Sequence, residues 1–236
     1  MLLQLDQMLT LAINGSHSLY VDHMAVLIAQ TVTWIPLAAV LAYVLLRHND
    51  LVSFGETLLA IALCILLADQ GASSVAKPLF MRYRPAHDPM IMYAVDIVDG
   101  YRGGLYGFFS SHASNTFAVA TFVSLLIRHR LLTALLFCWA LANCWSRAYL
   151  GVHYVGDLLT GAVWGFLVGY GIYSLWVRFS HHSVIWLKYH ASPAQPGSPA
   201  APNPLLTSSG YSVKSADLLS ATMVATFLYI TIRSLW

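Results

Sequence analysis

Charged side chains are scarce in this chain. Asp, Glu, Lys and Arg make up only 9% of its 236 residues, whereas 58% are hydrophobic and the mean hydropathy is +0.65. A net charge of +2 and the lack of any basic block exclude nucleic acid as a partner. This composition also excludes an ordinary soluble domain. It predicts an integral membrane protein, and the length suggests one domain, 1–236.

Cysteine is also rare, and basic residues are missing near the N-terminus. Cys64, Cys138 and Cys144 lie in apolar stretches, which argues against the disulfide framework of a secreted domain and for packed thiols. The first 46 residues contain no Lys or Arg, and Asp6 and Asn14 interrupt the early apolar run. A cleaved signal peptide is therefore not expected.

Apolar stretches of about 20 residues, the length that crosses a bilayer, predict the fold. We expect about six transmembrane spans, at residues 24–46, 57–76, 114–127, 131–145, 156–177 and 217–235. The third is short unless it includes Ser111 and His112. Residues 1–14 are too polar to cross and predict a short helix at the membrane interface. Since backbone groups find no water in the hydrocarbon, the spans should form an all-α integral membrane bundle.

Alternating these spans divides the basic residues between the two sides of the membrane. One side has Arg47, Arg128, Arg130, Arg178, Lys188 and Lys214, and the other has Lys77, Arg82, Arg84, Arg102, Arg147 and Arg233. Without Lys77, Arg84 and Arg147, which belong to the candidate site below, six basic residues remain on the first side and three on the second. This bias predicts a multi-pass membrane protein whose termini and site lie outside the cytoplasm.

Proline recurs between the last two predicted spans. Pro193, Pro196, Pro199 and Pro202 are spaced every third residue among Ala, Ser, Gly and Gln. This composition is typical of a polyproline-type or disordered linker. We therefore predict a cytoplasmic linker over residues 190–213, before the last span.

Three polar clusters are present in this otherwise apolar chain. They read Lys77…Arg84-Pro85, Ser110-Ser111-His112 and Ser146-Arg147…His153…Asp157. Together they supply cations to bind a phosphate, a nucleophile to attack it and an acid to protonate its leaving group. Ionisable groups that converge on one membrane face are functional-site candidates. The clusters therefore predict a phosphoryl-transfer site, carried in part by an external loop.

His153 and Asp157 are four residues apart at the start of the fifth predicted span. On a helix they would share a face, so that the carboxylate accepts a proton from one imidazole nitrogen and leaves the other free to attack. A polar pair that caps the helix is the alternative. A metal-ligand pair is disfavoured because no Glu is nearby and the loops contain no Cys. No metal is expected.

Arg147, Arg84 and Lys77 are candidates to bind the phosphate. The planar guanidinium of Arg147 or Arg84 suits two phosphate oxygens, and Lys77 adds a point charge. Each could instead anchor the end of a span. Ser110, Ser111 and His112 precede the third span, so their backbone N–H groups would offer an anion site, and Ser110 could equally be an N-cap. His112 can donate a proton to a departing alkoxide.

Other polar residues have simpler interpretations. Asp69 lies inside the second predicted span, eight residues before Lys77, and is expected to make a structural polar contact. His87 and Asp88 follow Arg84-Pro85 in the external loop, where they could shape a head-group pocket, but they are expected to be solvated loop residues.

These clusters resemble the motifs of the type 2 phosphatidic acid phosphatase superfamily, which are Lys-x6-Arg-Pro, Pro-Ser-Gly-His and Ser-Arg-x5-His-x3-Asp. The first and third match in full from Lys77 to Pro85 and from Ser146 to Asp157, whereas Phe109 and Ser111 replace Pro and Gly in the second. The resemblance implies a six-helix membrane bundle that needs no metal or cofactor.

The resemblance also implies the roles of the site residues. His153 would attack phosphorus to give a phosphohistidine, Asp157 would orient it, and His112 would protonate the leaving group. The transferring phosphoryl oxygens would be stabilised by Lys77, Arg84, Ser110, Arg147 and the backbone at Ser111.

The resemblance further implies a membrane lipid phosphate as substrate and a multi-pass protein of the bacterial inner membrane, with the site facing the periplasm. The segments Asn14-Gly15…His17 and Thr33-Trp34-Ile35-Pro36 resemble bacterial members that act on envelope lipids. Lipid A is therefore the first choice, followed by undecaprenyl diphosphate and then by phosphatidate or phosphatidylglycerophosphate. Functions of other classes are a vanadate-binding haloperoxidase and a non-catalytic lipid-binding or transport protein. The sequence assigns no oligomeric state.

Overall fold

The computed structural model describes residues 1–16, 18–180 and 205–236, and it confirms the all-α class. In these ranges the secondary structure is helical apart from two isolated β-bridges. The α-helices are α1 (Leu2–Ile13), α2 (Leu19–Ala29), α3 (Ile35–His48), α4 (Leu51–Gln70), α5 (Lys77–Phe80), α6 (Ser111–Ile127), α7 (Arg130–Tyr149), α8 (Val155–Phe179) and α10 (Val213–Arg233).

Five helical stretches of the described chain are long and apolar enough to cross a membrane. They are Thr31–His48, Leu51–Phe80, Arg130–Tyr149, Val155–Phe179 and Val213–Arg233. α6 is a shorter apolar helix of 17 residues. It begins at Ser111, so the third predicted span does include Ser111 and His112. With α6, the bundle matches the predicted membrane fold of about six spans.

The first predicted span, 24–46, is not one helix. α2 ends at Ala29, Gln30 is extended with ψ 124°, and a 3₁₀ turn at Thr31–Trp34 leads into α3. Pro36 lies in the first turn of α3. A proline suits a first turn but disrupts a helix interior, because it has no N–H and its ring clashes with the preceding turn. The prediction of a continuous helix through Pro36 was therefore wrong.

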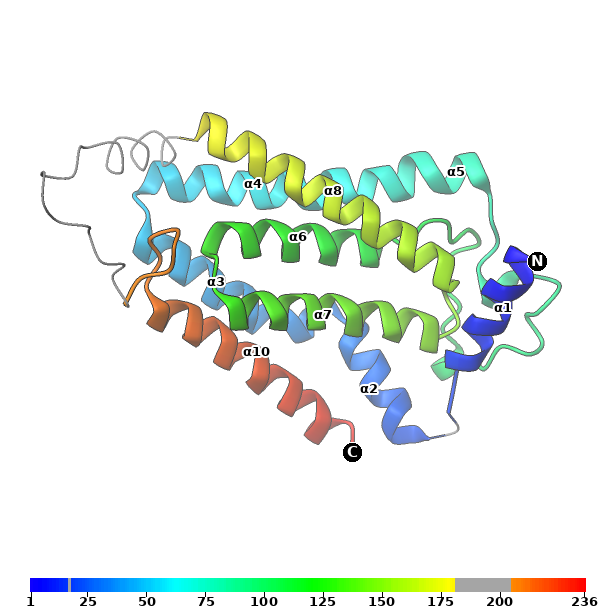
Figure 1. Ribbon diagram of the computed structural model, residues 1–236. Helices are drawn as coiled ribbons and strands as arrows, with labels where there is room; N and C mark the ends of the chain where they lie inside the picture. The colour runs from blue at the N-terminus through cyan, green and yellow to red at the C-terminus, as the bar shows by residue number, and fades with distance from the viewer. Residues whose placement is uncertain (17, 181–204) are drawn as a thin grey trace, which may run out of the picture.

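The second span is longer than predicted. α4, a π-helical segment at Gly71–Ala76 and α5 follow one another from Leu51 to Phe80, and left-handed Met81, with φ 43°, ends the run. This extension places Lys77 at one end of the bundle, beyond the last residue of the predicted span. We call that end the site end (Figure 1, right).

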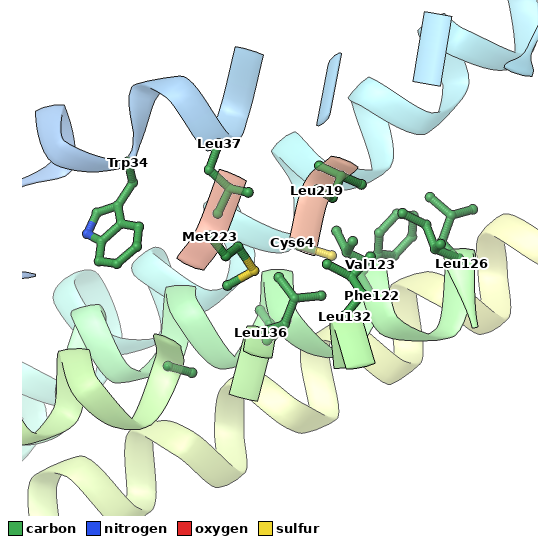
Figure 2. Close-up of a cluster of buried hydrophobic side chains, with 14 of the residues drawn as sticks. Trp34, Leu37, Cys64, Phe122, Val123, Leu126, Leu132, Leu136, Leu219 and Met223 are labelled. Atoms are coloured by element: carbon green, nitrogen blue, oxygen red, sulfur yellow. The ribbon is translucent and has the colours of Figure 1, made fainter. Parts of the chain in front are cut away.

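The apolar core surrounds α6. Figure 2 shows Phe122, Val123 and Leu126 of α6 packing near Leu132 and Leu136 of α7, in a core that α3, α4 and α10 also supply. Gly161, Gly165 and Gly169 of α8 face the backbone of α6, and a Cβ placed on Gly161 would lie 2.5 Å from the Ser110 carbonyl oxygen. This close approach brings the starts of α6 and α8 together.

α1 forms a helix where an interfacial one was predicted. It lies at the site end, beside the start of α8 (Figure 1). One face exposes Leu2, Leu5 and Met8, and the other places Asp6 and Thr10 against α8.

The predicted linker over 190–213 is described only in part. Residues 190–204, which contain all five prolines of this segment, lie outside the described residues, as do Lys188 and His17. Residues 205–213 include a tight turn closed by the bridge between Leu206 and Ser212. In this turn Tyr211 is buried, and the Ser209 hydroxyl donates to the Ile127 carbonyl at 2.8 Å.

Candidate active site

All the predicted site residues come together at the site end. Lys77 begins α5, Arg84 lies in the loop of residues 81–110, Ser110 to His112 start α6, Arg147 lies in the last turn of α7, and His153 and Asp157 flank the start of α8. The chain therefore delivers each group from the end of a different element. The phosphate-binding and catalytic candidates form one cluster.

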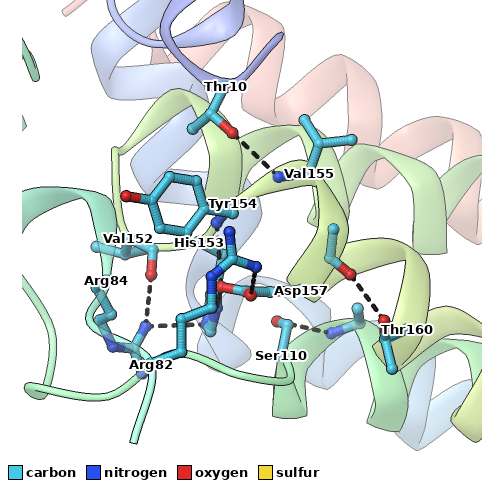
Figure 3. A network of polar contacts seen from close by, with 12 residues as sticks. Thr10, Arg82, Arg84, Ser110, Val152, His153, Tyr154, Val155, Asp157 and Thr160 are labelled. Atoms are coloured by element: carbon cyan, nitrogen blue, oxygen red, sulfur yellow. Dashed lines mark hydrogen bonds and ion pairs between the residues drawn. The ribbon is translucent and has the colours of Figure 1, made fainter. Parts of the chain in front are cut away.

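His153 and Asp157 are buried and paired, but not in the way the spacing predicted. His153 is 1% exposed and Asp157 is 0% exposed, and His153 Nδ1 lies 3.4 Å from Asp157 Oδ2 (Figure 3). However, α8 begins only at Val155, with Tyr154 as its N-cap. The same Oδ2 accepts the Tyr154 N–H at 3.1 Å. The two residues therefore do not share a helix face, because Asp157 caps the first turn and reaches back to His153.

Arg84 defines which imidazole nitrogen of His153 carries the lone pair. Arg84 Nη1 donates to His153 Nε2 at 2.9 Å and to the Val152 carbonyl oxygen at 2.9 Å. An arginine can only donate, so Nε2 carries the lone pair and Nδ1 carries the proton that faces Asp157. Burial and then the charge of Arg84 lower the pKa of His153 well below its usual 6.5. Near neutral pH the ring is therefore uncharged, with a nucleophilic Nε2.

The two arginines retain donors for an anion. Arg84 and Arg147 are 9% and 4% exposed, and the Nε of each is buried without a hydrogen-bond partner in the described chain. Arg147 Nη2 donates to the Tyr101 hydroxyl at 2.9 Å, and its Cζ lies 5.4 Å from the centroid of that ring. Burial and the neighbouring charge of Arg147 lower the pKa of Arg84. An oxyanion bound by both guanidiniums would offset this repulsion.

Lys77 is held through two serines. Its Nζ donates to Ser73 Oγ at 3.1 Å and to Ser111 Oγ at 3.3 Å. Ser73 lies in the π-helical segment, and its hydroxyl is 3.5 Å from Asp69 Oδ1. Asp69 thus contacts Ser73, which in turn binds Lys77. The structural polar contact predicted for Asp69 is present, but it is a long one.

Ser110 is the N-cap of α6, as one of the two interpretations predicted. Its Oγ accepts the Ala113 N–H at 3.4 Å, and its own N–H donates to the Asp157 carbonyl oxygen at 3.1 Å. The first turn of α6 is therefore fixed directly to α8. His112 lies in this turn, partly buried, and interacts electrostatically with Arg147, Arg84 and Lys77.

The two departures from the family's second motif have structural roles. Phe109 is 9% exposed and packs with Ala72 and Ala76 of the π-helical segment. Ser111 supplies the hydroxyl that binds Lys77. The larger residues fill space and add a contact at the loop without displacing Ser110 from its capping position.

Other residues of the site were missed by sequence reasoning. Arg82 Nη1 donates to Asp157 Oδ1 at 2.8 Å, and Arg82 Nη2 contacts Asp6 Oδ2 at 2.6 Å. Gly107 lies so close that a Cβ there would be 2.9 Å from Asp157 Oδ2. Arg82 stands inside the Lys-x6-Arg-Pro motif, which was a possible signal. For Asp6 and Gly107 the sequence offered none.

The assignment of Asp88 and His87 as solvated loop residues was also wrong. Both are partly buried. Asp88 Oδ2 accepts the hydroxyl proton of Tyr154 at 2.6 Å, and His87 Nε2 lies 3.3 Å from the Gly103 carbonyl oxygen. The contact of Asp88 attaches the loop of residues 81–110 to Tyr154, the N-cap of α8. The loop therefore packs against the start of α8 and borders the site.

Comparisons with known proteins agree with this geometry. The model of the PAP2 superfamily matches residues 57–181, which contain all three motifs. A lipid A 4′-phosphatase of Bacteroides thetaiotaomicron is 39% identical over 170 residues, which are 72% of this chain and 76% of that protein. A lipid A 4′-phosphatase of Porphyromonas gingivalis is 32% identical over 176 residues, or 75% of each chain.

A solved structure shares the fold. The crystal structure of a transmembrane PAP2-type phosphatidylglycerolphosphate phosphatase from Bacillus subtilis matches with a TM-score of 0.58 at 19% sequence identity. The match covers 76% of this chain and 88% of that one.

Proposed function

The chain belongs to the PAP2 superfamily, and from this premise we propose that it is a membrane lipid phosphatase whose substrate is the 4′-phosphate of lipid A. The substrate proposal is supported by two lipid A 4′-phosphatases that match about three quarters of the chain. One observation carries the chemistry: the buried, uncharged His153 presents its Nε2 to Arg84, beside a second buried arginine.

The first proposed step is attack by His153. The phosphate monoester binds to Arg84, Arg147 and Lys77, and the Arg84 donor moves from Nε2 to a phosphate oxygen. Nε2 then forms a bond to phosphorus while the bond from phosphorus to the lipid oxygen breaks. The ring keeps its Nδ1 proton and becomes cationic, and Asp157 stabilises that charge.

His112 is the proposed acid for the departing lipid oxygen. It starts α6 next to the arginines and lysine that hold the phosphate. A protonated imidazole there gives its proton to the leaving alkoxide, and the resulting neutral ring accepts a proton from the water that attacks the phosphohistidine. The second step releases inorganic phosphate and restores neutral His153.

We place this site at the outer face of the inner membrane. The support is the charge distribution, because Arg47, Arg128, Arg130, Arg178 and Lys214 are all exposed at the end of the bundle opposite the site. In this orientation the exposed leucines of α1 rest in the outer interface, and the predicted linker is cytoplasmic. The lipid chains of the substrate stay in the bilayer while its phosphate enters the site.

A substrate panel tests the proposed function. Detergent-purified protein is offered lipid A with phosphates at positions 1 and 4′, undecaprenyl diphosphate, phosphatidate and phosphatidylglycerophosphate, and released phosphate is measured. The expected result is fastest release from lipid A with the 1-phosphate retained on the product. Faster phosphate release from undecaprenyl diphosphate or a glycerophospholipid would show that this lipid, and not lipid A, is the preferred substrate. No release from any lipid would revive the non-catalytic lipid-binding alternative.

A further inference from the structure

Four polar side chains contact one another in a row that begins outside the three motifs. Asp6 of α1 contacts Arg82, Arg82 contacts Asp157, and Asp157 contacts His153. Figure 3 shows Arg82, Asp157 and His153. The Arg82 guanidinium also lies over the ring of Tyr154, with its Cζ 4.1 Å from the centroid. The orientation of Arg82 is thus fixed by two carboxylates and an aromatic face.

Both oxygens of the Asp157 carboxylate are occupied. Oδ1 accepts from Arg82 at 2.8 Å, while Oδ2 accepts the Tyr154 N–H at 3.1 Å and faces His153 Nδ1. A carboxylate held on both sides cannot rotate away from the imidazole. Arg82 therefore sets the geometry of the pair, although it does not contact His153.

Asp6 determines the charge of this group. Asp157 and Arg82 alone would sum to zero, and a neutral pair would stabilise a cationic His153 weakly. Asp6 makes the sum of the three side chains −1. When Nε2 bonds to phosphorus the ring becomes cationic, so the charges of the four side chains, of which His153 and Asp157 are buried and Asp6 and Arg82 are partly exposed, then sum to zero.

Asp6 also joins α1 to the first turn of α8. Its Oδ1 accepts the Gly156 N–H at 2.8 Å, and Thr10 Oγ1 accepts the Val155 N–H at 3.1 Å. Two unpaired amides at the start of α8 are thereby satisfied from another helix. Thr10 makes the same kind of attachment as Asp6 but carries no charge, so it offers a matched control.

We propose that Asp6 and Arg82 are positioning residues that orient Asp157 and supply the negative charge that stabilises cationic His153 during phosphoryl transfer. This inference rests on the proposed function, because it assumes attack by His153. It gives α1 a role in the reaction, since the helix with the exposed leucines delivers Asp6 to the site.

The binding affinities for orthovanadate and inorganic phosphate distinguish a positioning role of Asp6 from a purely structural one. Vanadate binds the attacking nitrogen as a five-coordinate mimic of the transition state, whereas phosphate reports ground-state binding. In the full-length purified protein, Asp6→Asn should weaken vanadate binding about tenfold and leave phosphate binding within about twofold. With lipid A it should lower kcat about tenfold with KM nearly unchanged, and Asp6→Glu should restore part of the loss.

The controls define what would overturn the inference. Arg82→Gln should lower kcat about a hundredfold, while Thr10→Val should leave kcat and vanadate affinity within about threefold. Equal losses in Asp6→Asn and Thr10→Val, or parallel losses for vanadate and phosphate, would show that Asp6 only attaches α1. If the wild-type protein released no phosphate from lipid A but Asp6→Asn still weakened vanadate binding alone, the proposed substrate would fail and the positioning role would stand.

Discussion

The two ends of the bundle contain the same basic residue type in opposite environments. At the site end, Arg84 and Arg147 are buried and bonded to protein groups. At the opposite end, Arg47, Arg128 and Arg178 are exposed. The presence of an arginine at the end of a span therefore does not by itself indicate a functional site. Burial distinguishes Arg84 and Arg147, the proposed phosphate ligands, from arginines that anchor a helix.

Polar contacts also differ between the ends. At the opposite end His48 Nε2 lies 2.8 Å from Ser215 Oγ, and Asn49 donates to the Leu45 carbonyl and the Tyr211 hydroxyl. These are contacts between groups that need no counter-charge. At the site end, several cations are crowded around an uncharged imidazole. Buried like charges are costly unless an anion joins them, so we propose that the site end binds an anionic ligand, whereas the contacts at the opposite end stabilise the fold.

The largest effect should come from the histidines of the two ends. His153→Ala removes the nucleophile and should lower kcat by about 10⁴-fold or more. His48→Ala should leave kcat within about threefold, because the hydrogen bond to Ser215 and the ring contact with Tyr211 that it removes lie at the opposite end of the bundle. Phosphate release by the two purified variants, with thermal unfolding as a check on folding, makes the comparison. Similar kcat values would mean that the site end has no special role.

The second largest difference is expected between substitutions of Arg147 at the site end and Arg128 at the opposite end. Arg147→Lys keeps the charge but loses the planar fork, so kcat/KM should fall about a hundredfold. Arg128→Lys at the opposite end should change it by less than about twofold. Steady-state kinetics on both variants test this difference. Wild-type turnover by Arg147→Lys would show that Arg147 is an anchor like Arg128.

Gly107 and Gly104, two glycines of the loop of residues 81–110, offer a comparison of kcat within the site end. A Cβ at Gly107 would meet Asp157 and Arg84, whereas a Cβ at Gly104 would meet nothing within 4 Å. Gly107→Ala should therefore lower kcat about tenfold or more by displacing the carboxylate, and Gly104→Ala should be nearly neutral. Equal kcat values for the two variants would mean that the close approach at Gly107 has no catalytic consequence.

The pH profile reports the environment of His153. Burial and Arg84 lower its pKa well below 6.5, so the uncharged nucleophile persists as the pH falls through 6.5. The acid limb of kcat/KM should then lie below pH 6.5. Because the unfolded chain takes up this proton at higher pH than the folded one, the lowered pKa also makes stability fall as the pH drops below 6.5. An acid limb above pH 6.5 would contradict this environment.

The smallest effect is expected from restoring the family glycine. Ser111→Gly removes one of the two hydrogen bonds of Lys77, while the bond to Ser73 remains. Activity should stay within about threefold of wild type. A loss as large as that of Arg147→Lys would show that Ser111 itself, and not only its backbone, is needed at the site.

The motifs predicted the members of the site, but not how the site is built. Ordered spacing identified the eight predicted residues because their types and order are specific. The pairing of His153 with Asp157 was predicted on a helix, yet it arises from capping, since spacing by four does not reveal where a helix begins. The break at Gln30 was missed, although Gln30, Thr31 and Pro36 interrupt the apolar run, because the span was assigned from the hydropathy of residues 24–46 as a whole. Asp6 could not be linked to Asp157, because the connection runs through Arg82 and depends on packing between distant segments.

The most direct measurement is the location of the phosphoryl group during turnover. Phosphohistidine survives in alkali, so the enzyme is mixed with lipid A, quenched in base and examined by peptide mass spectrometry. The account predicts a phosphoryl group on His153, its absence in His153→Ala and its presence in His48→Ala. A phosphoryl group on His112 or on any other residue would contradict it.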